Sequence, residues 1–322
     1  MTWNEMFGFP NDVESLKKAY KELAKKYHPD VNPDGATKFQ EVTALYNEAL
    51  KILDEANKLI IDTLNGSHLE YTYIGKYTVG RENIYISDNY IIIEFTGDTR
   101  SKFYDNFLNV TSDIKFSTPE VEAAFKFIKN RHLTVCKTGD KSYIIQKRGN
   151  LLPLRLVIES DGFKQDVDRY RHYVWMMNRM FAFACLMNDS ELSFNGFDID
   201  NIFVDMENHT LHFVNGFQYC CKLGNKLGAL PRFVYENVSV KTKQDCLCNA
   251  SIDVESILAI GRVFFDTSAP KELRDFCYNT VAVRNPLEAW KLFEETFKSV
   301  YAERKFITYD MSKLLNWKSM LK

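Results

Sequence analysis

The residues whose types and spacing most clearly indicate chemistry are His28, Pro29 and Asp30, which follow one another early in the chain. They place a titratable imidazole and a carboxylate on either side of a rigid proline. Five lysines stand just before them, and these are Lys17, Lys18, Lys21, Lys25 and Lys26. Taken alone, these residues leave two simple interpretations open. A histidine at a helix C-terminus often caps backbone carbonyls, and a lysine-rich helix face is usually only solvated.

Two helices are expected to hold this tripeptide in place. Apolar residues recur in steps of three and four before it, which predicts one apolar helix face made of Val13, Leu16, Tyr20, Leu23 and Tyr27. The lysines fall mainly on the other side of that helix. Asn11-Asp12 offers an N-cap, and Pro29 ends the helix because proline supplies no N–H. A second helix is predicted over residues 36–61, and the turn-rich loop 28–35 suits an antiparallel hairpin.

The segment from Ala19 to Asp30 resembles the J-domain family, and the likeness covers about 60 residues. It continues through Asn32-Pro33, residues 38–42, Tyr46 and Ala49-Leu50, and residues 3–9 stand where the family has its short first helix. The resemblance implies that the basic face docks on the ATPase and linker region of a DnaK-type heat-shock chaperone. It also implies that His28, Pro29 and Asp30 trigger ATP hydrolysis by that partner.

Other sequence features of the family, a Gly/Phe-rich linker and Cys-x-x-Cys zinc repeats, are absent from the sequence. The chain is therefore similar to J proteins that carry an unrelated second domain, which usually selects the client or the location. We expect a multidomain α and α+β fold in four parts. They are a helical-hairpin J domain (1–64), a linker (65–70), a β-rich lobe (71–160) and a mostly helical lobe (161–322).

The second domain is predicted to be rich in strands in its first part and mostly helical in its second part. Aromatic and β-branched runs predict strands at 71–74, 83–86, 90–95, 133–136 and 142–146. Helices are predicted at 119–131, with Ser117-Thr118 as cap candidates, and at 167–188, 252–265, 271–279 and 286–301. A short strand pair is predicted at 201–204 and 210–214. This order is similar to the bilobal protein-kinase fold, in which 142–152, 195–205, 211–217 and 252–256 resemble the hinge, catalytic loop, metal-motif strand and buried-aspartate helix.

The resemblance does not extend to the catalytic residues. Phosphoryl transfer in kinases uses a lysine on the third strand, a catalytic aspartate, and an Asn/Asp pair for magnesium. On this alignment those positions hold Glu94, Gly196, Asn201 and Asn215, so that only Asn201 matches. Glu94 is expected to repel phosphate. A shifted register would offer Asp198 as a base.

These departures indicate a pseudokinase with no catalytic residues, no cofactor and no metal. The alternative interpretations are structural. Residues 195–201 also suit an ordinary turn between a helix and a hairpin. Asp253, at the position of the buried aspartate, also suits a helix N-cap paired with Ser256.

Composition restricts the remaining classes of function. The net charge is −2 and gives no clear nucleic-acid signal, and the seven cysteines have no zinc-site spacing. Neither a signal peptide nor a membrane span is apparent, so a soluble, cytoplasmic protein is expected. The favoured hypothesis is a co-chaperone whose kinase-like domain binds an unknown protein client or a site. The alternatives are an atypical phosphotransferase recruited through its J domain, and a decoy that docks a chaperone without activating it.

Overall fold

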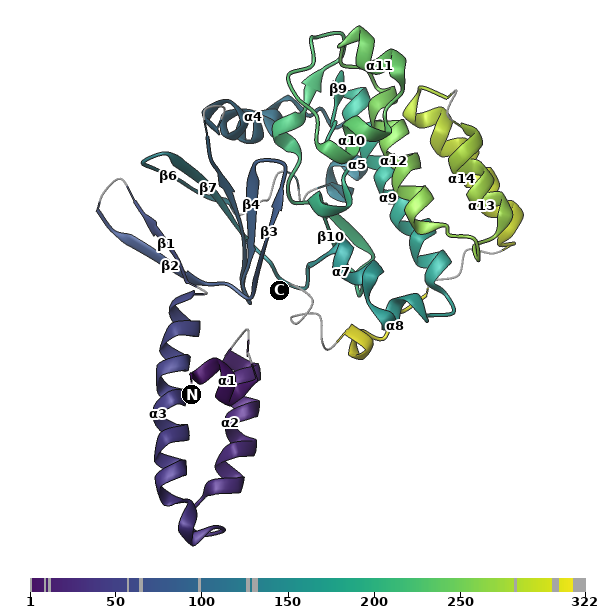
Figure 1. The fold of residues 1–322 in the computed structure, drawn as a ribbon. Helices are drawn as coiled ribbons and strands as arrows, with labels where there is room; N and C mark the ends of the chain where they lie inside the picture. Colours follow the sequence, from purple (N-terminus) through teal and green to yellow (C-terminus); the bar gives the residue numbers. More distant parts are fainter. Residues whose placement is uncertain are drawn as a thin grey trace. The chain divides into compact units, whose positions relative to one another are not determined.

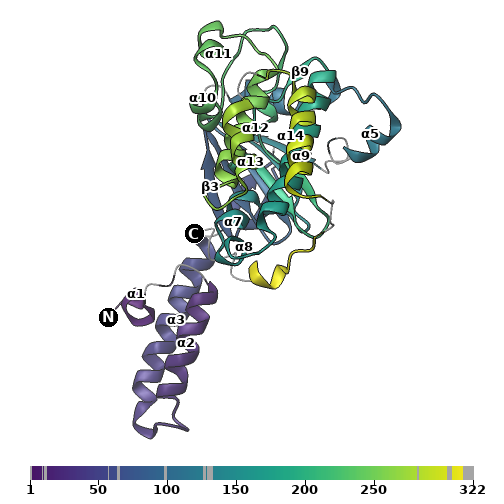
Figure 2. The same ribbon diagram turned by 90° about the vertical axis from the view of Figure 1, so that its right-hand side faces the viewer.

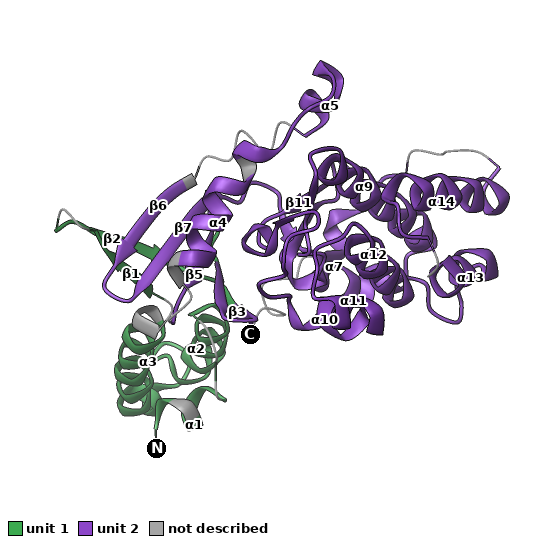
Figure 3. Ribbon diagram, turned by 90° about the horizontal axis from the view of Figure 1, so that it is seen from above, with its two compact units in different colours: residues 1–76, 86–88, 322 green, residues 77–85, 89–321 purple. Residues whose placement is uncertain are grey.

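The computed structural model describes residues 2–8, 10, 13–56, 58–63, 66–97, 100–125, 128, 133–280, 283–302 and 307–314 (Figure 1). The chain divides into two compact units, coloured separately in Figure 3. The first consists mainly of residues 1–76 and 86–88, and the second of residues 77–85 and 89–321. Each unit is described below by itself.

The first unit is built on the predicted helical hairpin. Its helices are α1 (Trp3–Phe7), α2 (Val13–Tyr27) and α3 (Ala36–Ala56), with the short 3-10 helix η1 (Pro33–Gly35) before α3. Leu16, Val42 and Ala49 are fully buried between the helices. The ring of Tyr20 stacks on that of Tyr46 at 4.1 Å. The predicted N-cap Asn11-Asp12 lies outside the described residues.

A β-hairpin follows α3. It occupies residues that were predicted to form the last turn of the helix 36–61 and part of the linker 65–70. Strand β1 (Lys58–Asp62) pairs antiparallel with β2 (His68–Thr72), with Ile61 opposite Leu69. The helix therefore ends at Ala56 rather than at residue 61, and part of the predicted linker 65–70 lies in β2. The physical reason is the alternation along β1, where Leu59 and Ile61 are buried and Ile60 is exposed.

The β-rich part contains a five-stranded sheet in the order β3-β4-β5-β7-β6. Its strands are β3 (Gly75–Val79), β4 (Glu82–Ile86), β5 (Tyr90–Phe95), β6 (Leu133–Thr138) and β7 (Lys141–Lys147). Helix α4 (Arg100–Asp113) was not predicted. Its Tyr104 and Phe107 pack edge-on against Phe95 of β5, each at 6.0 Å between ring centroids.

The remaining part of the chain is mostly helical, as predicted. Figure 2 shows α9 (Arg169–Asp189) beside α12 (Ser251–Phe264) and α14 (Pro286–Val300), with α13 (Lys271–Asn279) next to α12. Helix α12 is buried along almost its whole length. The predicted strand pair is present as β10 (Ile202–Asp205) and β11 (Thr210–Phe213).

Shorter elements complete this part. The described part of the helix predicted at 119–131 is α5 (Pro119–Ala124), and Thr118 caps it by accepting a hydrogen bond from Val121 N. The others are β8 (Leu152–Pro153), α7 (Leu154–Glu159), α8 (Asp161–Lys164), β9 (Leu192–Ser193), the 3-10 helices η2 (Ile199–Asn201) and η3 (Phe217–Tyr219), β12 (Cys221–Lys222), α10 (Arg232–Asn237), α11 (Val240–Asp245) and the 3-10 helix η5 (Met311–Leu314).

Candidate functional site

The His28-Pro29-Asp30 loop joins α2 to α3 and is held by its own backbone. The carbonyl of His28 accepts hydrogen bonds from Val31 N at 2.9 Å and Asn32 N at 2.8 Å. The His28 ring packs edge-on against Phe39 of α3, with ring centroids 5.2 Å apart. The side chains remain accessible, with 46% of His28 and 85% of Asp30 exposed. This loop is thus a fixed, exposed turn.

The surface beside the loop is basic with an apolar centre. The structure places all five predicted lysines of α2 in exposed positions. A shallow groove of about 340 Å³ lies here, lined by Tyr20, Lys21, Ala24, Lys25, His28 and Val31. Val31 is 74% exposed. The arrangement suits an acidic partner surface with an apolar contact at its middle.

In the second unit, Asp253 of α12 fixes the loop that follows α9. Its Oδ2 accepts a hydrogen bond from Phe194 N and its Oδ1 one from Asn195 N, each at 2.8 Å. Burial raises the pKa of Asp253 to about 6, although these two hydrogen bonds oppose the shift. Asp253 therefore holds a distant loop and does not cap its own helix, which decides between the two interpretations of this residue.

Gly196 occupies a position that has no room for a side chain. A Cβ atom built on Gly196 would lie 2.7 Å from Gly216 Cα and 2.9 Å from Phe194 Cε1. Gly216 itself adopts a left-handed φ of +106°, and its own Cβ would meet the Phe194 ring at 2.7 Å. The two glycines are in close contact because neither has a side chain. An aspartate does not fit at position 196 in this packing.

Asn201 and Asn215 are brought together in the core of the same loop region. The Nδ2 of Asn215 donates to the Oδ1 of Asn201 at 2.9 Å, and Asn201 Nδ2 donates to the carbonyl of Gly196 at 3.1 Å. Gln218 completes the set by donating from Nε2 to Asn215 Oδ1 at 2.8 Å. The amides of Asn201 and Asn215 are fully buried and bonded to each other. No carboxylate takes part in this network.

Asp198 lies nearby but has a local role. Its Oδ1 accepts a hydrogen bond from Asp200 N at 3.0 Å, which caps η2. Burial raises the pKa of Asp198 to about 6, and the neighbouring charge of Asp200 adds to that shift. Asp200 is held in turn by Arg155, whose Nη2 donates to Oδ2 at 2.7 Å. Asp198 is thus a buried turn residue whose carboxylate caps the adjacent 3-10 helix by accepting a hydrogen bond from the backbone two residues later.

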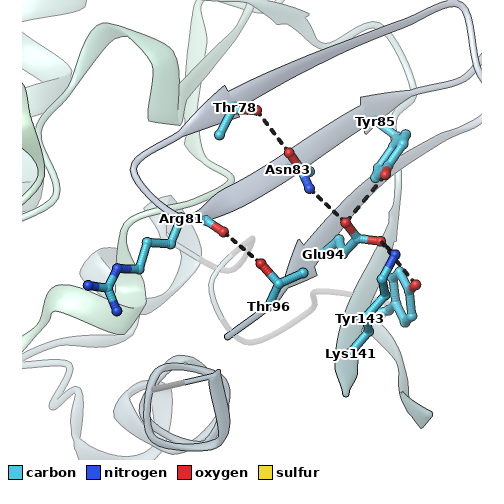
Figure 4. A network of polar contacts seen from close by, with 8 residues as sticks. All are labelled: Thr78, Arg81, Asn83, Tyr85, Glu94, Thr96, Lys141 and Tyr143. Atoms are coloured by element: carbon cyan, nitrogen blue, oxygen red, sulfur yellow. Dashed lines mark hydrogen bonds and ion pairs between the residues drawn. The ribbon is translucent and has the colours of Figure 1, made fainter. Parts of the chain in front are cut away.

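Glu94 lies on β5 within a polar network on one face of the sheet (Figure 4). Its carboxylate accepts hydrogen bonds from Asn83 at 2.7 Å, Tyr143 at 3.0 Å and Lys141 at 3.1 Å. Burial alone would raise the pKa of Glu94, but these hydrogen bonds and the charge of Lys141 outweigh it and lower the pKa. The Glu94 charge is therefore compensated within the sheet.

The orientation of Glu94 bears on its expected repulsion of phosphate. Side chains alternate along a strand, so Glu94 points away from the face on which Phe95 meets α4. On the face of Phe95, the ring of Phe107 packs against the ring of Phe217, with the two centroids 5.7 Å apart. Phe217 belongs to the same loop as Asn215. Glu94 does not point toward that loop, and a phosphate there would not meet its charge. Strand β5 nevertheless carries no lysine in any register.

A carboxylate that does face this loop is Glu82 of β4, which was not predicted from the sequence. Tyr219 donates from its hydroxyl to Glu82 Oε2 at 3.1 Å, and only 1% of Glu82 is exposed. Burial raises the pKa of Glu82. The strand before it ends at Val79, so Gly80 and Arg81 alone form the turn into β4, with φ of +64° at Gly80. This turn is a tight hairpin with a single glycine.

Comparison with known proteins identifies the first domain. Residues 10–58 match the family model described as the DnaJ domain. The chain is 59% identical over 51 residues to the chaperone protein DnaJ of Ruminiclostridium cellulolyticum, and 44% identical over 59 residues to that of Lachnospira eligens. These matches cover 15% and 17% of this chain, and 12% and 15% of the two relatives. The chain thus carries a DnaJ-type J domain and shares only a small part of those relatives' length.

The rest of the chain has a protein-kinase-like fold. It is similar to a solved structure described as the ROP18 kinase domain in complex with AMP-PNP and sucrose, with a TM-score of 0.50 and 8% identity. That match covers 76% of this chain and 84% of the other. A structure of vaccinia related kinase 3 is also similar, with a TM-score of 0.48 and 9% identity, over 75% of this chain and 90% of the other. At such low identity the likeness concerns the fold alone.

Among the described residues, no helix is long and apolar enough to cross a membrane. The described part of the chain also contains no group of three or more His, Cys, Asp or Glu residues that could hold a metal ion.

Proposed function

We propose that this protein is a cytoplasmic co-chaperone that docks on a DnaK-type chaperone and stimulates its ATPase. The observation that carries the proposal is the exposed His28-Pro29-Asp30 turn beside the lysine face of α2. A fixed turn next to a basic surface supports docking in one orientation, because charge complementarity guides both encounter and register. The J-domain match over residues 10–58 supports a DnaK-type chaperone as the partner.

We propose further that the kinase-like domain is a catalytically inactive adaptor for a protein client or a site. Three features support this role. Gly196 leaves no space for a catalytic aspartate, the Asn201 and Asn215 amides bind each other, and the buried Glu82 carboxylate faces the same loop. Magnesium prefers carboxylate and water oxygens, and phosphate is repelled by carboxylate. These residues do not fit Mg-ATP, so no phosphotransfer step is derived.

The ATPase proposal is tested with the full-length chain and a purified DnaK-type chaperone. Single-turnover ATP hydrolysis by the chaperone is measured with wild-type protein and with His28→Gln. We expect His28→Gln to leave hydrolysis at the chaperone's basal rate. The matched control is His68→Gln, a 70% exposed histidine in the same unit, which should keep full stimulation. Equal stimulation by wild type and His28→Gln would contradict the proposal.

The adaptor proposal is separated from the phosphotransferase alternative by nucleotide binding. Titration calorimetry of the full chain with Mg-ATP should show no heat of binding up to millimolar nucleotide. Magnesium-dependent binding together with label transfer lost in Asp198→Asn would replace the adaptor proposal with the alternative.

A further inference from the structure

Two thiols of the kinase-like domain lie side by side, although they are far apart in the sequence. Cys221 lies on β12, and Cys248 lies in the segment before α12, 27 positions later. Both are free cysteines. The Sγ of Cys248 donates to the carbonyl oxygen of Cys221 at 3.3 Å. The thiol of Cys221 is itself close enough to add to the rise in the pKa of the Cys248 thiol.

The backbone around this pair is held by hydrogen bonds on both sides. Gly224 N donates to the carbonyl of Cys248, and Cys248 N donates to the carbonyl of Asn225, each at 2.8 Å. Strand β12 in turn pairs with β9, where Cys221 lies opposite Ser193. A disulfide forms only where the backbone brings two cysteines within about 7 Å of each other. These bonds hold together the two ends of the segment between the cysteines, which favours such a bond.

The two thiols differ in their access to solvent. Cys221 is half-buried, whereas only 1% of Cys248 is exposed. Burial raises the pKa of the Cys248 thiol to about 12, so this sulfur stays protonated and shielded. The thiolate is the form that reacts with oxidants, and it must be reached from outside. An external oxidant therefore meets Cys221 first, and Cys248 is the thiol available beside it.

The neighbouring cysteines are placed differently. Cys246 is exposed, but its Sγ donates to the carbonyl of Lys243 on α11 at 3.1 Å. Its sulfur is thus directed toward its own helix. Cys220 directly precedes Cys221 and is buried. These two residues provide matched controls, because each stands within two positions of one member of the pair.

We propose that Cys221 and Cys248 form an oxidation-sensitive dithiol site that a hydroperoxide converts into a disulfide. The Cys221 thiolate attacks the peroxide, so that an S–O bond forms, the O–O bond breaks, and water or an alcohol leaves with the thiol proton. This sulfur, now a sulfenic acid, has lost two electrons. The Cys248 sulfur then attacks it, the S–S bond forms, the S–O bond breaks, and a second water leaves with the Cys248 proton. The site is independent of the co-chaperone role proposed above.

The disulfide would fasten one segment of the kinase-like domain at its base. Residues 222–247, which carry α10 and α11, would become a covalently closed loop. Cys248 also lies beside the loop that Asp253 holds, since its Sγ accepts a hydrogen bond from Asn195 Nδ2 at 3.6 Å. A cross-link removes conformations from the unfolded chain. We therefore expect the oxidised protein to melt roughly 5–10 °C above the reduced protein.

The first experiment identifies the bond. Reduced full-length protein is treated with hydrogen peroxide, digested with trypsin without reductant and analysed by mass spectrometry. Trypsin leaves Cys220 with Cys221 on one peptide and Cys246 with Cys248 on another, so variants assign the pair. The cross-linked peptides should appear in wild type, Cys220→Ala and Cys246→Ala, and should disappear with dithiothreitol. They should be absent from Cys221→Ala and Cys248→Ala. A cross-link that persists in either of these two variants would overturn the assignment.

The second experiment tests the order of events and their effect on the fold. In Cys248→Ala the sulfenic acid has no thiol beside it, so dimedone should label Cys221 after peroxide treatment. In Cys221→Ala, Cys248 should remain unlabelled. Thermal melts should show the rise on oxidation in wild type and not in Cys248→Ala, with each fold checked by circular dichroism. The wild-type digest does not depend on whether a variant folds. No cross-link in the wild type, or the same rise in Cys248→Ala, would refute the proposal.

Discussion

The side-chain amides of Asn201 and Asn215 are joined by a hydrogen bond of 2.9 Å in the buried centre of the kinase-like domain. The alignment predicted from the sequence places them at the positions whose side chains hold magnesium in an active kinase. Here one amide satisfies the other, and Gln218 satisfies the remaining oxygen of Asn215. The network is complete without a metal, which makes it a structural element whose loss affects stability.

Placing an aspartate at position 196, where the predicted alignment has the catalytic aspartate of kinases, should damage the fold and should not create activity. In Gly196→Asp, the new Cβ would lie 2.7 Å from Gly216 Cα, so the backbone must shift. We expect a loss of about 2 kcal/mol or more in the free energy of unfolding, the usual scale of overpacking in a core. Urea denaturation measures it. Gly228→Asp is the control, since its nearest neighbour is a lysine Nζ 3.9 Å away, and it should be close to neutral.

Placing a carboxylate at position 215, where the predicted alignment has the kinase metal ligand, should cost stability in the absence of metal. In Asn215→Asp, an oxygen replaces the Nδ2 donor and faces Asn201 Oδ1, so two acceptors meet in a buried site. We expect a loss of about 2 kcal/mol. Millimolar Mg²⁺ should recover part of it, because carboxylate and amide oxygens suit that ion, and should leave the wild type unchanged. Thermal melts with and without Mg²⁺ decide this, with the exposed Asn225→Asp as control. A Mg²⁺-stabilised wild type would show that Asn215 already supports a metal site.

Glu82 should make stability fall as the pH rises. Burial raises its pKa in the folded state, so the folded protein holds this proton more tightly than the unfolded chain does. Its contribution is therefore fully present below the unfolded pKa and is lost as the pH rises through the folded pKa. Glu82→Gln removes the charge and keeps a polar group facing Tyr219. Relative to wild type, this variant should gain stability from pH 4 to pH 8 in denaturation curves, whereas Glu236→Gln, a 55% exposed site, should not.

His172 should make the stability of the protein fall as the pH falls. Burial lowers its pKa to about 4, and its Nδ1 already accepts the Trp175 N–H, which opposes protonation. The unfolded histidine takes up a proton near pH 6.5 while the folded one stays neutral. Stability from this group is therefore lost as the pH falls from about 6.5 to about 4, by up to about 3 kcal/mol. His172→Gln should flatten this part of the stability profile, and His68→Gln should not. An unchanged profile in His172→Gln would refute the assignment.

The first domain could be predicted almost entirely from sequence because its signals are local. The apolar stripe from Val13 to Tyr27 and the stop at Pro29 both act within a few turns of chain. Only the end of α3 was misplaced, since Leu59 to Ile61 continue an apolar run that suits a helix as well as a strand. The hairpin partner that decides the matter, Leu69, lies across the turn.

The second domain was harder to predict because its decisive contacts are distant. Helix α4 was missed, although Tyr104, Phe107 and Val110 recur in steps of three, because its other residues mask the period. The side of β5 to which Glu94 points could not be found from Tyr90–Phe95, since both faces of that strand are buried. Glu82 gave no signal before its contact with Tyr219, 137 residues later, was known. Gly196, Asn201 and Asn215, which loop spacing related in the predicted kinase-like alignment, lie together in the structure.

The two bonds from Asp253 also bear on how this protein forms during synthesis. The bond to Phe194 spans 59 positions of the sequence and the bond to Asn195 spans 58. The loop that contains these two residues is therefore fixed only after α12 has been made. The J domain depends on short-range helical contacts, which form quickly. At about 5–20 residues per second, the roughly 200 residues between α3 and Asp253 take about 10–40 s to translate. During that interval the nascent chain carries a folded J domain ahead of an unfolded domain of its own, so under the proposed co-chaperone role the first unfolded segment within reach of the chaperone is this protein's own kinase-like domain.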